Sequence, residues 1–120
     1  MADDAAGRMK ARLRADLVVA MKARRSDEAR TIRALVAAID NAEAPPLPDG
    51  HKPADSTRFE DGSAEIARLA LDAERVRAVI AADLGEREAA IVEMERLGQG
   101  ERAETLRGEA AVVRRYLDAG

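Results

Sequence analysis

The sequence has no cysteine and no tryptophan, and its 120 residues include one histidine (His51), one phenylalanine and one tyrosine. The lack of cysteine excludes disulfides, thiolate metal sites and cysteine nucleophiles, and a single histidine excludes most zinc, haem and Ser-His-Asp sites. There is also no run of about 18 apolar residues that could span a membrane, and the charged N-terminal region has no apolar stretch typical of a signal peptide. We therefore expect a cytoplasmic protein without membrane association, metal or cofactor.

Alanine and charged residues dominate what is present. The chain contains 27 Ala and 17 Arg, 36% of its residues are charged, and its formal net charge is −3. Alanine and arginine are strong helix formers, so the composition favours an all-α protein and argues against a β-sandwich. The length suits a single domain covering residues 1–120.

Apolar residues recur at steps of three and four in four segments, which is the spacing of amphipathic helices. The expected helices cover about residues 5–24, 27–43, 72–97 and 101–117. Their ends follow from local signals, with Ser26 and Asp72 as N-caps and Gly98 as a left-handed C-terminal cap. Within the third helix, Arg87 interrupts the apolar positions, and Gly85 costs about 1 kcal/mol relative to alanine.

The connections between these helices suggest how they are arranged. The short linker between the first two predicts an antiparallel hairpin. Three prolines then end the second helix, so residues 44–62 are expected to form a long proline-rich loop, and residues 63–71 are left unassigned. The predicted fold is an irregular all-α array of four helices, with an N-terminal hairpin, this loop, a long third helix and a C-terminal helix.

No group of residues resembles a catalytic centre. Phosphate-loop and dinucleotide fingerprints are absent, no predicted helix contains a histidine, and neighbouring carboxylates such as Glu86 and Glu88 point to different helix faces. His51 is expected to be an exposed loop residue without a metal, because no second histidine or cysteine could complete the coordination shell. We therefore assign no catalytic residues.

Most of the remaining polar residues fit an ordinary helix surface. Acidic residues precede arginine by three positions in pairs such as Asp27/Arg30 and Glu74/Arg77, and such pairs contribute only about 0.2–0.5 kcal/mol each. Tyr116 is expected to anchor the last helix, with its hydroxyl group in solvent.

Positively charged residues of the first two helices are the best candidates for a binding site. A basic helical hairpin can bind the phosphate backbone of a nucleic acid by releasing counterions. These cations spread around the polar side of the first helix, so a plain solvated surface is the competing interpretation. The candidate nucleic-acid-binding residues are Arg8, Arg12, Lys22, Arg24, Arg25 and Arg33.

Several segments together resemble one known family. Residues 20–24 (Ala-Met-Lys-Ala-Arg) and 32–43 (Ile-Arg-Ala-Leu-Val-Ala-Ala-Ile-Asp-Asn-Ala-Glu) are similar to the N-terminal helical hairpin of YqeY-like proteins. Residues 95–98 (Glu-Arg-Leu-Gly) and the closing Tyr116-Leu117 look like the family's glycine turn and last helix. The chain thus resembles GatB/YqeY-type domains over most of residues 8–117.

This resemblance implies an all-helical module related to the C-terminal region of the B subunit of bacterial Glu/Asp-tRNA amidotransferase. That enzyme is a carbon–nitrogen ligase with glutamine as amido donor; its tail contacts tRNA, and the chemistry sits in other domains. Family members typically continue into a second, tail-like helical domain, which we expect this chain to lack.

The expected function is a non-catalytic accessory module that binds tRNA, another RNA, or a component of the amidotransferase or tRNA-synthetase machinery. The alternative is a protein–protein interaction module or small homodimer with no RNA role. An amide-transfer enzyme in its own right is disfavoured, since it would require a nucleophile and a base.

Overall fold

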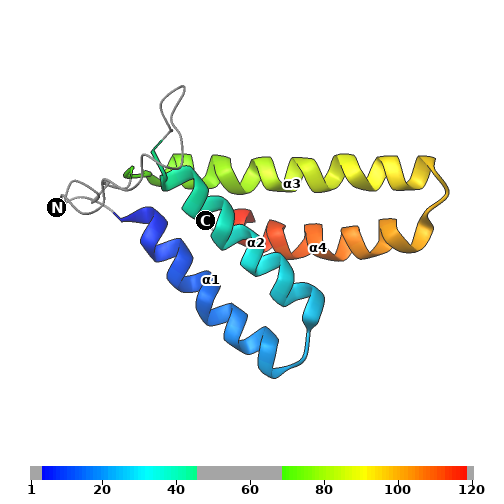
Figure 1. Ribbon diagram of the computed structural model, residues 1–120, viewed down its shortest axis with the longest axis horizontal. Coiled ribbons are helices and arrows are strands. Elements are labelled where there is room, and N and C mark those ends of the chain that lie inside the picture. The colour runs from blue at the N-terminus through cyan, green and yellow to red at the C-terminus, as the bar shows by residue number, and fades with distance from the viewer. Residues whose placement is uncertain (1–3, 46–68, 119–120) are drawn as a thin grey trace, which may run out of the picture.

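The computed structural model describes residues 4–45 and 69–118, which form four α-helices and no β-strand (Figure 1). Helix α1 covers Ala5–Lys22, α2 covers Ser26–Glu43, α3 covers Ala73–Arg96 and α4 covers Gly100–Asp118. The all-α prediction is confirmed, and each predicted helix end lies within two residues of the observed one. Among the described residues, no helix is long and apolar enough to cross a membrane. His51 and most of the predicted proline-rich loop lie outside this part of the chain.

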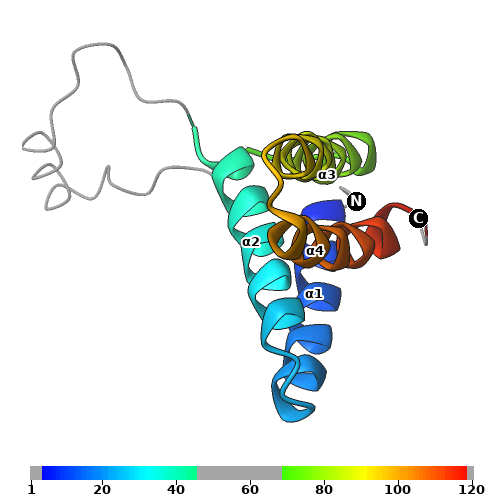
Figure 2. The same cartoon turned by 90° about the vertical axis from the view of Figure 1, so that its right-hand side faces the viewer.

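The helices form two antiparallel hairpins that cross each other (Figures 1 and 2). Helix α1 pairs with α2, and α3 pairs with α4, while α2 also packs against both helices of the second hairpin. Each hairpin extends beyond the other, so the α1–α2 turn and the α3–α4 turn lie far apart (Figure 1). The predicted N-terminal hairpin is therefore present.

The core lies where the two hairpins cross. Leu13 of α1, Leu35 of α2, Ile80 of α3 and Val113 of α4 are each at most 1% exposed. Burying a side chain of this size contributes about 1.5–3 kcal/mol. Every helix thus supplies at least one fully buried apolar residue to the same core.

The turn between α1 and α2 differs from the prediction. Arg24 has a φ of 61°, and the N–H of Arg25 donates to the carbonyl of Ala20 at 2.9 Å, which is the Schellman arrangement at a helix C-terminus. Because this turn closes α1 at Lys22, α2 already begins at Ser26 and Arg25 occupies the N-cap position, without a side-chain cap. The prediction that Ser26 is the N-cap is therefore wrong.

The ends of α3 agree with the prediction. The Asp72 carboxylate accepts a hydrogen bond from the N–H of Arg75 at 2.8 Å, as an N-cap does. At the other end Gly98 has a φ of 75°, so it is the left-handed residue that ends the helix. Both signals are local in sequence, which is why they could be predicted.

Candidate functional site

The predicted nucleic-acid-binding cations lie in two groups. Arg8 and Arg12 are near the N-terminal end of α1, whereas the other four surround the α1–α2 turn. At 1.5 Å per residue, the sixteen positions from Arg8 to Arg24 correspond to roughly 24 Å along the helix. The structure thus divides the six residues between two separate places. We call Lys22, Arg24, Arg25 and Arg33 the tip cluster.

Arg24, Arg25 and Arg33 of the tip cluster line an exposed depression of about 520 Å³ that also includes Arg30. Lys22 is the exposed last residue of α1. Arg25 is 3.7 Å from Glu28, and Arg30 is paired with Asp27. Within the described part of the chain, Lys22 and Arg24 have no ion-pair partner. Their charges are therefore available to an external anion.

The second group lines a groove between α1, α3 and the C-terminal end of α4, with a volume of about 320 Å³. Arg8 and Arg12 come from α1, and Arg77 of α3 adds a third cation that sequence analysis had not assigned to a site. Arg77 had been expected to pair with Glu74. Its guanidinium donates instead to the carbonyl oxygen of Leu117 at 2.5 Å. The remaining lining residues are Ala5, Met9, Ala73, Val76, Ile80 and Tyr116.

Tyr116 links α4 to α1 beside this groove. Its hydroxyl donates to Oδ2 of Asp16 at 2.6 Å, and the guanidinium carbon of Arg12 lies 4.6 Å from the ring centroid. Tyr116 is only 2% exposed, so the prediction of a solvated hydroxyl is wrong. Burial raises the pKa of Tyr116, and the hydrogen bond to Asp16 raises it further. The sequence could not indicate this contact, because the two residues are 100 positions apart.

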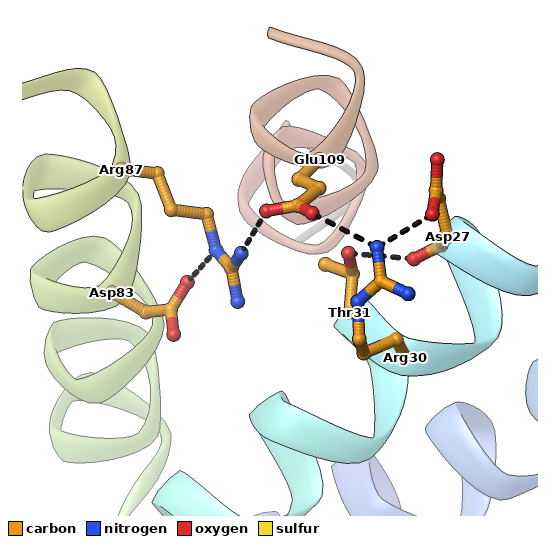
Figure 3. A network of polar contacts seen from close by, with 6 residues as sticks. All are labelled: Asp27, Arg30, Thr31, Asp83, Arg87 and Glu109. Carbon is orange, nitrogen blue, oxygen red and sulfur yellow. Dashed lines mark hydrogen bonds and ion pairs between the residues drawn. The ribbon is translucent and has the colours of Figure 1, made fainter. Parts of the chain in front are cut away.

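A buried carboxylate joins three helices (Figure 3). Glu109 of α4 is 6% exposed, and its Oε1 accepts a hydrogen bond from Nη1 of Arg87 on α3 at 2.6 Å. Its Oε2 accepts from Nη2 of Arg30 on α2 at 3.4 Å. Arg87 also donates to Asp83, and Arg30 to Asp27. Since both of its oxygens face arginines, Glu109 is suited to holding helices together and poorly suited to accepting a proton from a substrate.

A second internal ion-pair network joins α1 to α2. Nζ of Lys10 lies 2.9 Å from Asp40 and 2.5 Å from Glu43, and all three residues are at least partly buried. The hydrogen bonds to these carboxylates, with Asp40 first, raise the pKa of Lys10. This network also pairs its charges internally, so it stabilises the hairpin.

No family model, curated protein or solved structure gives a significant match to this chain. The resemblance to GatB/YqeY-type domains therefore stays a prediction from the sequence.

The remaining chemical possibilities are limited. Between residues 4 and 45 and between 69 and 118, no three His, Cys, Asp or Glu side chains are grouped so as to hold a metal ion. The carboxylates Glu86 and Glu88 are exposed, as expected for helix surface. The candidate binding residues of the described structure therefore form two separate groups of cations, one in the tip cluster and one in the groove.

Proposed function

We propose that this chain is a non-catalytic helical module that binds RNA through the tip cluster. The observation that carries the proposal is that Arg24, Arg25 and Arg33 line one exposed depression at the turn where Lys22 ends α1. Lys22 and Arg24 have no ion-pair partner among the described residues. Cations in such a position bind phosphates by releasing counterions, and the arginine fork matches two phosphate oxygens at once.

The position of the turn also supports this proposal. The α1–α2 hairpin extends away from α3 and α4, so its turn is an end of the molecule (Figure 1). A rigid nucleic-acid backbone can approach this end without meeting the second hairpin. The overall charge of −3 opposes binding elsewhere on the surface, which favours one localised contact. Transfer RNA is the first RNA to test, because the family resemblance implies it.

The test is fluorescence anisotropy of labelled tRNA titrated with the protein between about 50 and 200 mM salt, with duplex DNA as the comparison. We expect saturable binding that prefers tRNA and weakens with salt. The double variant Lys22→Glu/Arg24→Glu is expected to lose affinity and to lower the salt slope by about two, because two phosphate contacts are lost.

The matched control is Arg75→Glu/Arg102→Glu, which changes the net charge equally at exposed positions of α3 and α4. This control is expected to retain most of the affinity. Equal losses in the two variants would show that only overall charge matters. Absence of binding at the lowest salt concentration would overturn the proposal.

A protein–protein interaction module or small homodimer is the second candidate, and exposed apolar residues favour it. Val18, Val19 and Met21 of α1 are 50%, 56% and 52% exposed in adjacent turns. A component of the amidotransferase machinery, or a second copy of the chain, would be the partner in this case. Sedimentation equilibrium distinguishes the two candidates. A wild-type dimer that dissociates in the variant Val18→Ser/Val19→Ser would support the interaction module, whereas a monomeric wild-type protein would argue against the homodimer.

A further inference from the structure

The side of α3 that faces away from the core has a row of uncharged residues. Ala78, Ala82, Gly85, Ala89 and Val92 recur at steps of four and three, and all five are exposed. The corresponding face of a surface helix normally has charged and polar residues. The other three helices lie below or beside α3, and none of them lies above it (Figures 1 and 2). We call these five residues the outer face of α3.

Two residues of the outer face indicate close contact with another helix. Val92 is 65% exposed, more than any other large apolar side chain in the described part of the chain. A Cβ at Gly85 would meet no atom within 4 Å, so packing within the chain does not require a glycine there. A glycine inside a helix does allow a second backbone to approach closely.

The outer face is complementary to itself when it is reversed about Gly85. Ala78 and Val92 lie seven positions before and after Gly85, so an antiparallel copy places the valine of one chain on the alanine of the other. Ala82 and Ala89 lie three positions before and four positions after Gly85, so small residues also meet there. Large residues opposite small ones let two helices interdigitate.

Charges near the two ends of α3 favour the same arrangement. Glu74 and Arg75 have no ion-pair partner in the described part of the chain, whereas Glu93 and Arg96 form an exposed pair. Arg75 and Glu93 are eighteen positions, or about five turns, apart, so they lie on the same flank of the outer face. In an antiparallel pair each flank meets the same flank of the second copy. Arg75 then lies near Glu93 of that copy, and Glu74 lies near its Arg96.

We propose that the outer face of α3 binds a second copy of this chain, with the two α3 helices antiparallel about a two-fold axis at Gly85. A parallel pair would instead place Arg75 against Arg75 and Glu93 against Glu93, and like charges across an interface oppose binding. The charges therefore select the direction of the second copy. The two-fold axis closes the assembly at two chains.

The contact is small, so the association is weak. Typical stable interfaces involve about 20–30 residues from each partner, whereas the outer face and the four flanking charged residues provide about nine. We expect half of the chains to be associated at about 10–100 µM. The outer face and the tip cluster lie on different hairpins, so this proposal and the RNA proposal can fail independently.

The first test is sedimentation equilibrium of the full chain from about 5 to 500 µM. Gly85→Glu places two carboxylates together at the axis and is expected to weaken association at least tenfold. Gly108→Glu is the matched control, because Gly108 is also an exposed glycine inside a helix with no atom near its Cβ position. This control is expected to change the affinity less than twofold. Thermal unfolding at about 5 µM, where the chain is monomeric, checks that each variant is folded.

Charge reversal tests the direction of the pair. Arg75→Glu and Glu93→Arg are each expected to weaken association at least threefold, because each places like charges together. The double variant Arg75→Glu/Glu93→Arg restores opposite charges across the interface and is expected to regain at least half of the wild-type affinity. A residue that matters only for folding of its own chain would show no such recovery.

Four results would overturn the proposal. The first two are no association up to about 500 µM and equal effects of Gly85→Glu and Gly108→Glu. The third is a double charge variant that associates no better than the single ones. The fourth is a dimer that dissociates in Val18→Ser/Val19→Ser but not in Gly85→Glu, since this would place the interface on α1.

Discussion

Glu109 is the least exposed charged residue among those described, and its two oxygens face Arg87 and Arg30. We expect Glu109→Gln to lower the free energy of unfolding by about 1.5–3 kcal/mol, the range for hydrogen bonds to charged groups. Arg87 keeps Asp83 as a partner, which limits the loss. Urea unfolding followed by far-UV circular dichroism measures the change.

Glu104→Gln is the matched control on the same helix. Glu104 is paired with Arg107, but its side chain is 77% exposed. Exposed pairs contribute about 0–1 kcal/mol, so this variant is expected to be nearly silent. Similar losses in the two variants would contradict the structural role assigned to Glu109.

At the scale of the helices, two glycines are expected to respond in opposite directions to alanine. Gly85 is inside α3 and a methyl group there would meet no atom within 4 Å, so Gly85→Ala is expected to stabilise the protein by up to about 1 kcal/mol. Gly98 has a φ of 75°, so Gly98→Ala is expected to destabilise it by about 1–2 kcal/mol. Thermal unfolding of both variants provides the test, and effects of the same sign would show that α3 does not end as described.

The helices could be predicted because their signals are local. Apolar spacing, the Asp72 cap and the Gly98 turn each involve residues within a few positions of one another. The pairing of Glu109 with Arg87 could not be predicted in this way, because the two residues lie on different helices and 22 positions apart. In the sequence, Arg87 could be recognised only as a charged residue that interrupts the apolar positions of the third helix. Nothing in the sequence indicated which carboxylate it would pair with.

The candidate site shows the same limit. The sequence indicated that cations are frequent in the first two helices, but the division between the tip cluster and the groove depends on how the hairpins cross. Arg77 and Tyr116 join Arg8 and Arg12 only because α3 and α4 pass the N-terminal end of α1. That crossing depends on side-chain packing between distant segments, which periodicity does not encode.

At the scale of the whole molecule, the crossing hairpins share one core, so damage at its centre is expected to unfold all four helices together. Ile80 is 1% exposed, and Ile80→Asp would bury a carboxylate without a partner. We expect this variant to lose cooperative thermal unfolding, as we do for Leu35→Asp and Val113→Asp. Ala82→Asp, on the exposed side of α3, is expected to unfold almost as the wild type does. A sharp transition near the wild-type temperature in Ile80→Asp would contradict the core assignment.

The environment of Tyr116 also has an optical consequence. The chain has no tryptophan and a single tyrosine, so near-ultraviolet fluorescence of the native protein originates from this one ring. The ring lies between Arg12 and the Asp16 carboxylate and lines the groove. Emission intensity and lifetime therefore report on the junction of α1 and α4 without any added label. Separation of the two helices can be followed in the unmodified protein.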